Sequence, residues 1–311
     1  MLERENPIVA PIGAETIPIG AAFYTVFLCI IFGANAVAIK IGLTGLGVFT
    51  AAAIRFGVAS VVIFLWARFT GKPLRVNSKQ LKSLVLLGLI FYVQLSFFYI
   101  GLSKTTASHG TLIANILPFV VLVLAHFFIE NDKISLKKSL GLIFGFGGVL
   151  ILFGDTAQLS REAMQGDLIV LCAVLIWGCN AIYTKRIFIS LQPSQVTFYP
   201  VAISAHLFLI SALVWDPEMI RFVDRPVLVS MLYQIFVTAS FGLIAWTTLM
   251  KRYGATALHS FIFIMPLSGV FFGIVLLGEP LTINLIGAIV MVTIGLIVVN
   301  RNGGKRLKRR P

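Results

Sequence analysis

The chain has 311 residues, of which 58% are hydrophobic and only 12% are charged, and its mean hydropathy is +0.97. Soluble domains carry about 25% charged residues, so this composition argues against a soluble enzyme, a disordered protein and a nucleic-acid-binding protein. The net charge of +13 comes from basic residues in short gaps between apolar stretches, a pattern typical of loops that flank membrane helices. The sequence therefore predicts an integral membrane protein.

Ten stretches are apolar enough, and close enough to the roughly 20 residues that a helix needs, to cross a bilayer. They are predicted at residues 20–40, 47–67, 82–103, 107–129, 136–153, 166–186, 195–215, 227–250, 256–277 and 281–299. Residues 1–19 are expected to be a short tail and not a signal peptide, because they lack an apolar core. Residues 300–311 are expected to form a second, basic tail.

The basic residues predict the orientation of the chain. Of 25 Lys and Arg, nineteen lie in segments that would share one side of the membrane with the N-terminus, and Arg55 lies within the second stretch. The five on the other side are Lys40, Lys104, Arg161, Arg221 and Arg225. Because Lys and Arg concentrate on the cytoplasmic side, both termini are predicted to be cytoplasmic in a bacterial-type inner (plasma) membrane.

The two halves of the chain repeat each other. Phe32–Ala36, with Lys40 after it, recurs as Trp177–Ala181 followed by Lys185. Further matched positions are Thr106–His109 with Thr256–His259, Pro118 with Pro266, Glu130 with Glu279, and Gly141 with Gly287. Each half contains five predicted helices, an odd number, so the second half would cross the membrane in the opposite sense. An inverted-topology repeat of this kind is common in secondary transporters, whose substrate site lies between the halves.

These motifs resemble the drug/metabolite transporter superfamily, and within it the ten-helix EamA-type exporters. The resemblance rests on the Phe/Trp-Gly-x-Asn opening of each half, Arg55-Phe56, Lys104-Thr105-Thr106-Ala107-Ser108 leading to Pro118, and Gly278-Glu279-Pro280-Leu281-Thr282. It covers residues 20–300. It implies an all-α membrane protein of ten transmembrane helices, built from two inverted five-helix repeats at residues 20–153 and 166–299.

Two asparagines occupy matching positions in otherwise apolar helices, Asn35 in the first half and Asn180 in the second. An amide that faces lipid would lack hydrogen-bond partners, so both are expected to face the interior. One interpretation is a pair of amides around a central substrate cavity, with aromatic walls that include Trp177. The other is interhelical hydrogen bonding that holds the two halves together.

The third predicted helix carries a polar stripe. Tyr92, Ser96, Tyr99 and Ser103 recur at i, i+4, i+7 and i+11, which places them on one helical face. The corresponding face of the eighth helix is more aromatic and includes Trp246. Hydroxyl groups find no partners in lipid, so this face is expected to line the cavity, with aromatic core packing as the alternative. The candidate substrate-binding residues are therefore Asn35, Tyr92, Ser96, Tyr99, Trp177, Asn180 and Trp246.

Pro118 and Pro266 lie inside the fourth and ninth predicted helices, where each removes a backbone donor and favours a kink. Matched kinks suit a gate or hinge, and static curvature is the alternative. His109 and His259, near the starts of the same helices, and His206 in the seventh are candidates for proton or substrate contacts. A location at headgroup level, or a hydrogen-bonded packing role, is the other interpretation.

Charged side chains inside the predicted spans are few. Arg55 is expected to pair with a carbonyl or to extend to the outer surface, and Lys40 and Lys185 are expected to reach the interface in the same way. No Asp or Glu is predicted in the middle of a span. Coupling of transport to protons would then need a histidine or an unusual relay, and passage down a substrate gradient is the alternative.

No cluster with metal-ligand spacing, and no nucleophile with a base nearby in sequence, is visible, so no catalytic residue, metal or cofactor is predicted. The favoured function is an exporter of small metabolites, such as amino acids or amphipathic compounds, that works by alternating access. The alternative is a membrane-embedded enzyme acting on a lipid-linked substrate. The predicted partners are a small-molecule substrate and the lipid bilayer, without nucleic acid. The chain is expected to be a monomer or a homodimer, since Gly141-x-x-x-Gly145 and Gly269-x-x-x-Gly273 can pack helices within or between chains.

Overall fold

The computed structural model describes residues 18–128, 136–188, 190–253, 258 and 261–300, and this part of the chain is helical apart from short connections. Among these residues the only β-type pairing is one isolated bridge between Leu46 and Ile220. The basic C-terminal tail, nearly all of the N-terminal tail, Glu130 and His259 lie outside the described residues.

The helices follow the predicted stretches in chain order. The first half contains α1 (Ile19–Gly33), α2 (Asn35–Gly45), α3 (Val48–Phe69), α4 (Ser78–Lys104), α5 (Ala107–Ala114), α6 (Leu117–Phe128) and α7 (Leu136–Leu159). The second half contains α8 (Arg161–Ile187), α9 (Pro193–Trp215), α10 (Arg225–Leu232), the π-helix η1 (Tyr233–Gly242), α11 (Leu243–Tyr253), α13 (Ile264–Leu277) and α14 (Ile283–Asn300). Successive helices join into longer rods, namely α1 with α2, α5 with α6, and α10 with η1 and α11.

Seven of these rods are long and apolar enough to cross a membrane. They are Ile19–Gly45, Val48–Phe69, Ser78–Lys104, Ala107–Phe128, Arg161–Ile187, Pro193–Trp215 and Arg225–Leu249. Three further apolar helices, at Lys138–Gly154, Ile264–Leu277 and Ile283–Val299, are shorter. The chain is thus an all-helical integral membrane protein in its described part, and length supports seven of the ten predicted spans.

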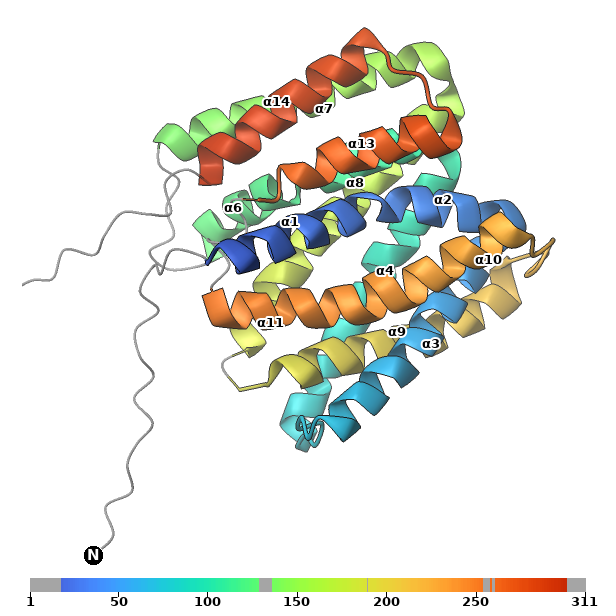
Figure 1. Ribbon diagram of the computed structural model, residues 1–311, viewed down its shortest axis with the longest axis vertical. Helices are drawn as coiled ribbons and strands as arrows, with labels where there is room; N and C mark the ends of the chain where they lie inside the picture. The colour runs from blue at the N-terminus through green and yellow to red at the C-terminus, as the bar shows by residue number, and fades with distance from the viewer. Residues whose placement is uncertain (1–17, 129–135, 189, 254–257, 259–260, 301–311) are drawn as a thin grey trace, which may run out of the picture.

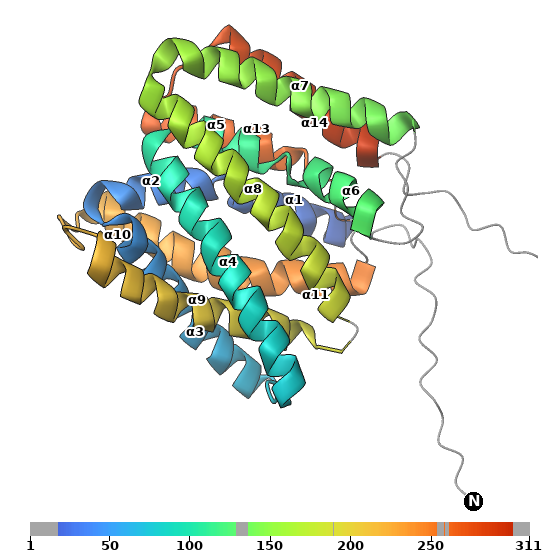
Figure 2. The same ribbon diagram turned by 180° about the vertical axis from the view of Figure 1, so that it is seen from behind.

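The helices pack in pairs that repeat between the halves. Along one edge of the bundle α7 lies beside α14, and towards the opposite edge α3 lies beside α9 (Figure 1, Figure 2). Between them α4 packs on α8, and α2 makes the equivalent contact with α10. In the same way, the contact of α6 with α8 corresponds to that of α13 with α1. Each half therefore packs against the other through the same set of surfaces.

The first rods of the two halves run in opposite directions. Lys40, near the end of α2, donates hydrogen bonds to the carbonyl oxygens of Leu102, at 3.0 Å, and of Thr105. The Thr105 hydroxyl in turn donates to Asp167 Oδ1, at 2.5 Å, near the start of α8. The end of the first rod thus lies near the beginning of the sixth, as an inverted repeat requires. These contacts also show that the half-buried ammonium group of Lys40 is held by carbonyls at the end of α4, and its expected location at the interface stays a prediction.

Glycines allow the closest helix contacts. A Cβ atom on Gly269 of α13 would lie 2.2 Å from Thr111 Cγ2 and 2.9 Å from the carbonyl oxygen of Gly33, so no larger residue fits. A Cβ atom on Gly141 of α7 would lie 2.4 Å from Val299 Cγ2 of α14. Both predicted small-residue motifs therefore pack helices within one chain.

The two prolines stand at helix starts. Pro118 is the second residue of α6 and Pro266 the third residue of α13. The first turn of a helix tolerates proline because its N–H groups have no intrahelical acceptor. Between Ala114 and Leu117 the fourth rod is interrupted, so Pro118 follows a break between two helices and does not kink a continuous one. Their action as hinges stays a prediction.

Replacing Gly269 with alanine should lower the free energy of unfolding by about 1–3 kcal/mol, because the added methyl group overpacks a contact between backbones. Gly57→Ala is the matched control, since a Cβ atom at Gly57 meets nothing within 4 Å. Thermal unfolding of both variants in detergent measures the difference. Equal melting temperatures would show that the α1–α13 contact can relax without cost.

Candidate functional site

A cavity of about 690 Å³ lies among α4, α8, α9 and α11. This volume is within the range of sites for small molecules. Its walls are mostly apolar and include Leu87, Phe91, Val196 and Leu243, and none of the described residues that line it is charged. Its polar side chains are Asn180, Thr184, Ser190, Gln192, Thr197 and Thr247. The cavity suits an amphipathic ligand with a few hydrogen-bonding groups.

Asn180 has an unused donor in this cavity. The residue is only 8% exposed, and its Oδ1 accepts a hydrogen bond from Thr184 Oγ1 at 3.2 Å. Its Nδ2 has no hydrogen-bond partner among the described residues. A buried donor left unpaired costs about 1–3 kcal/mol, so an acceptor on a ligand would be stabilised here.

The cavity reaches the connection between α8 and α9. This connection is tied to the one between α3 and α4, because Gln195 Nε2 donates to the Arg75 carbonyl at 2.6 Å. The two connections and the adjoining helix ends carry Lys72, Arg75, Lys185 and Arg186. We call this side of the molecule the basic end.

At the other side, which we call the closed end, carboxylates of the second half hold helix starts of the first. Asp216, which follows α9, accepts hydrogen bonds from Thr50 N at 2.7 Å and Thr50 Oγ1 at 2.8 Å, at the start of α3. Glu279, which follows α13, accepts from Ala107 N at 2.6 Å and Ser108 N at 2.9 Å, at the start of α5. Each carboxylate satisfies N–H groups that the helix leaves free and lies at the positive end of the helix dipole.

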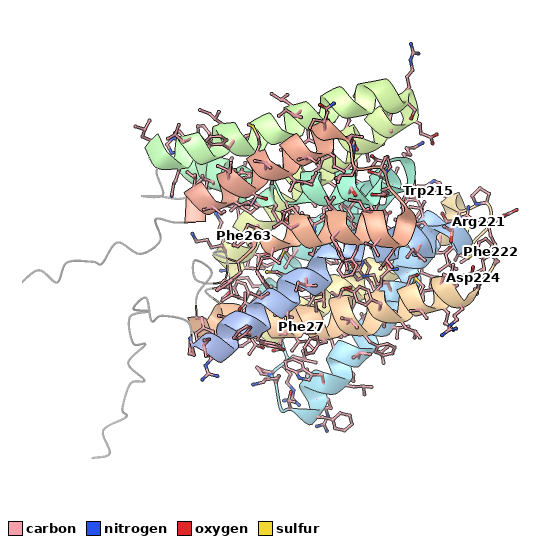
Figure 3. The ribbon with its side chains drawn as sticks, turned by 45° about the horizontal axis from the view of Figure 1, so that its top comes forward. Phe27, Trp215, Arg221, Phe222, Asp224 and Phe263 are labelled. Atoms are coloured by element: carbon pink, nitrogen blue, oxygen red, sulfur yellow. The ribbon has the colours of Figure 1, made fainter. Side chains whose placement is uncertain are left out.

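The connection between α9 and α10 also covers the closed end. Arg221 N donates to the Gly45 carbonyl at 2.8 Å, and its guanidinium donates to the Leu46 carbonyl at 2.9 Å. Figure 3 shows Trp215, Arg221, Phe222 and Asp224 gathered at this one end of the molecule. The closed end is therefore held by hydrogen bonds between the halves.

A buried histidine–aspartate contact lies just inside the closed end. Asp167 of α8 is fully buried, and its Oδ2 lies 2.9 Å from Nδ1 of His109, which is 3% exposed. Asp167 is the seventh residue of the 27-residue helix α8, so it is a buried carboxylate near a helix start, and the expectation that none lies in the middle of a span is not contradicted. The sixth span was predicted to begin at residue 166, whereas α8 begins at Arg161, which places Asp167 about two turns inside the helix. His109 is accordingly buried within the protein.

Arg55 is the centre of a second buried polar cluster. The side chain is 7% exposed, and it donates to Tyr99 Oη at 3.2 Å and to Thr238 Oγ1 at 3.1 Å. From the sequence, Arg55 was expected to extend to the outer surface or to pair with a carbonyl. Among the described residues its partners are instead two hydroxyl groups, which hold the side chain inside the protein. A lone arginine at the centre of a membrane helix costs roughly 2.5–3.5 kcal/mol on insertion, so these contacts stabilise a group that lipid would reject.

The cluster continues through the π-helix. Gln234 Oε1 accepts a hydrogen bond from Tyr99 at 3.2 Å, and Gln234 Nε2 donates to the Ala38 carbonyl at 3.0 Å. Thr238 Oγ1 lies 3.0 Å from Asn35 Oδ1. The Arg55 cluster therefore comprises Arg55, Tyr99, Gln234, Thr238 and Asn35. It links both halves, and its π-helical segment is of a kind often found at functional sites.

Gln234 and Thr238 were not predicted. They stand four residues apart in the eighth apolar stretch, the same spacing that marked the polar stripe of the third, so the signal was present in the sequence.

The predicted substrate-binding residues do not gather in one site. Asn180 alone of the seven substrate-binding candidates lines the cavity, while Asn35 and Tyr99 belong to the Arg55 cluster. Tyr92 shares a hydrogen bond of 2.6 Å with Ser211, and Ser96 bonds within its own helix.

The two candidate tryptophans pack against phenylalanines. Trp177 meets Phe98 with ring centroids 6.5 Å apart, and Trp246 meets Phe32 at 5.9 Å. His206 is exposed on the outside of α9, and its Nδ1 lies 2.7 Å from the Ala202 carbonyl oxygen of the same helix. None of these three lines the cavity.

Replacing Thr238 with valine keeps the shape of the side chain and removes the hydroxyl that accepts from Arg55. We expect a loss of about 1–3 kcal/mol in the free energy of unfolding, because a buried charged donor loses its partner. Thr248→Val is the control, since Thr248 is exposed and bonds only to the Ile244 carbonyl of its own helix. Equal thermal stability of the two variants would contradict a stabilising role for the cluster.

Comparison with known proteins gives the chain a family. The EamA-like transporter family model matches it twice, at residues 19–154 and 164–301. An uncharacterized transporter, YoaV, of Bacillus subtilis is 22% identical over 86% of this chain and 92% of its own length. A probable amino-acid metabolite efflux pump of Salmonella typhimurium is 26% identical over 89% of this chain and 93% of its own length.

The fold has also been seen in a crystal structure. One solved chain superposes with a TM-score of 0.67, at 16% sequence identity, over 93% of this chain and the whole of its own length. At that identity the likeness concerns the fold alone.

Proposed function

The chain belongs to the EamA-like transporter family, and from that premise we propose that it exports a small amphipathic metabolite, such as an amino acid, by alternating access. The proposal includes ten spans in two inverted repeats, at residues 20–153 and 166–299, with residues 1–19 and 300–311 as cytoplasmic tails. The observation that supports it is the uncharged cavity at the end opposite the closed end, in which Asn180 Nδ2 has no partner among the described residues. Two relatives named as probable amino-acid metabolite efflux pumps support the substrate class.

The orientation follows from the charge distribution. Basic loops remain on the cytoplasmic side of membranes, so we place the basic end in the cytoplasm. The cavity then faces inward and the closed end outward, the state in which an exporter would take up its substrate. Transport would require the bonds of Asp216, Arg221 and Glu279 at the closed end to open while the basic end closes.

Other parts of the proposal concern motion, assembly and coupling. The breaks before Pro118 and Pro266 would serve as the hinges. The protein would act as a monomer or homodimer in a bacterial-type inner membrane. His109, paired with Asp167, is the candidate for a proton contact, and His259 remains the candidate that the repeat predicts. An enzyme acting on a lipid-linked substrate is not favoured, because two relatives are named as probable efflux pumps.

A topology experiment tests the orientation. A reporter fused at Gly303 should give a cytoplasmic signal, and a reporter inserted in the connection 216–224 should give an external one, as the excess of basic residues at the opposite end requires. A cytoplasmic signal from the connection would contradict both the orientation and the ten-span inverted repeat.

Replacement of Asn180 by leucine tests the cavity as the transport site. We expect proteoliposomes with the wild-type chain to release at least one preloaded L-amino acid faster than empty liposomes. Asn180→Leu should slow this release by about tenfold or more, since leaving a buried acceptor of the ligand without its donor costs about 1–3 kcal/mol and the cavity shrinks. Cys179→Leu, at the exposed neighbouring position, should keep the wild-type rate. Wild-type release by Asn180→Leu would exclude the cavity as the route.

A further inference from the structure

The Arg55 guanidinium is a buried positive charge held only by neutral groups. Its two described hydrogen bonds go to the hydroxyls of Tyr99 and Thr238, and its Cζ lies 5.0 Å from the centroid of the Phe56 ring. Its Nε is buried and has no hydrogen-bond partner among the described residues. Within that part of the chain no carboxylate forms an ion pair with Arg55.

The unpaired Nε–H of Arg55 indicates what kind of partner the guanidinium lacks. Buried charges are normally paired, because neutral dipoles replace only part of the hydration that a cation loses. The Nε–H and an adjacent Nη–H of arginine form a planar fork that matches the two oxygens of a carboxylate. Here both hydroxyl partners bind Nη atoms, so the Nε side of the fork is available. An anionic group is the partner that best fits it.

Two aromatic rings in succession, those of Phe56 and Phe91, connect this charge to the cavity. The Phe56 ring that lies against Arg55 packs on Phe91, with ring centroids 5.5 Å apart, and Phe91 lines the cavity. One helical turn after Phe91, Gln94 is 2% exposed, and its Oε1 has no described partner. With Asn180 Nδ2 in the cavity itself, three buried polar groups on α3, α4 and α8 remain unused, two of them donors and one an acceptor.

We propose that Arg55 is the binding site for the carboxylate of the transported molecule. This assignment rests on the transport proposal above and gives the substrate a chemical class, an acid or zwitterion with an apolar body. The carboxylate would reach the guanidinium past Phe56 and Phe91. The unused oxygen of Gln94 would accept from an ammonium or other donor group of the same molecule. In the empty protein, Tyr99 and Thr238 hold the guanidinium in place.

Matched acids and amides test this assignment on the purified protein. The probes are L-leucine, L-phenylalanine, L-threonine and L-cysteine, each compared with its C-terminal amide, with binding measured by calorimetry. We expect at least one acid to bind roughly tenfold to hundredfold more tightly than its amide, the difference that one or two hydrogen bonds to a charged group make. Equal affinity of every acid and its amide, or no binding of any acid, would overturn the assignment.

Substitution then locates the effect. Arg55→Gln should bring the affinity for the acid down to that for the amide, and Arg55→Lys, which keeps the charge and loses the fork, should retain part of the preference. Arg68→Gln removes an exposed arginine from the same helix and should leave the preference intact. An undiminished preference for the acid in Arg55→Gln would overturn the proposal. If that variant does not fold, Arg55→Lys decides, because an undiminished preference in the lysine variant would likewise exclude the fork.

Flux experiments separate this proposal from the transport proposal on which it rests. If the protein does not transport these compounds, proteoliposomes will show no release of acid or amide, although the binding preference persists. If Arg55 is not the carboxylate site, release will continue without distinguishing acids from amides.

Discussion

Polar groups inside an apolar bundle must find partners within the protein, and this constraint accounts for much of the structure. Where the first rod breaks after Gly33, Tyr233 donates a hydrogen bond to the Ile31 carbonyl at 2.5 Å. Where α3 and α5 begin, Asp216 and Glu279 accept from their free N–H groups. In each case the partner belongs to the other half of the chain. Side chains of the second half therefore bind the backbone groups that are left free where helices of the first half break or begin, and these hydrogen bonds hold the two halves together.

The same constraint divides the interior into layers. The closed end contains the carboxylate caps and the His109–Asp167 pair, and the Arg55 cluster forms a second polar layer that both halves share. The aromatic contact of Phe56 with Phe91 separates Arg55 from the cavity. A ligand in the cavity thus meets the Phe91 ring, and the Phe56 ring lies between Phe91 and the Arg55 guanidinium. This arrangement would let a small movement of rings change the electrostatic environment of the site.

Sequence patterns predicted the helices well and their contacts only in part. Ten apolar stretches are recognisable because a helix in lipid needs a long apolar run, and each of the ten overlaps at least one helix of the described part. Asn35 and Tyr99 were predicted to face the interior because their polar groups would find no hydrogen-bond partners in lipid. Asp167 was missed because hydropathy does not fix the start of a helix to within a turn, and one turn decides whether a carboxylate is buried.

The cavity and the partners of Arg55 could not be derived in the same way. Asn180 and Asn35 occupy matching positions in the two repeats, yet Asn180 lines the cavity whereas Asn35 accepts a hydrogen bond from Thr238. Which of two equivalent residues meets open space depends on how four rods pack, and no local pattern encodes that. Gln234 and Thr238 carried a readable i, i+4 signal, but their pairing with α3 depends on tertiary packing and on the π-helical winding of η1.

The position of Arg55 along the chain has a consequence for the order of assembly. Its helix, Val48–Phe69, is made early, whereas Tyr99 follows 44 residues later and Thr238 follows 183 residues later. During synthesis the apolar residues of α3 must therefore carry the guanidinium into the bilayer before either partner exists. The bond to Tyr99 can form once the third span is in place, whereas the bond to Thr238 forms only once the eighth rod has arrived, so the latter stabilises a nearly complete bundle. Loss of Thr238 should accordingly leave insertion of α3 intact and weaken only the finished protein.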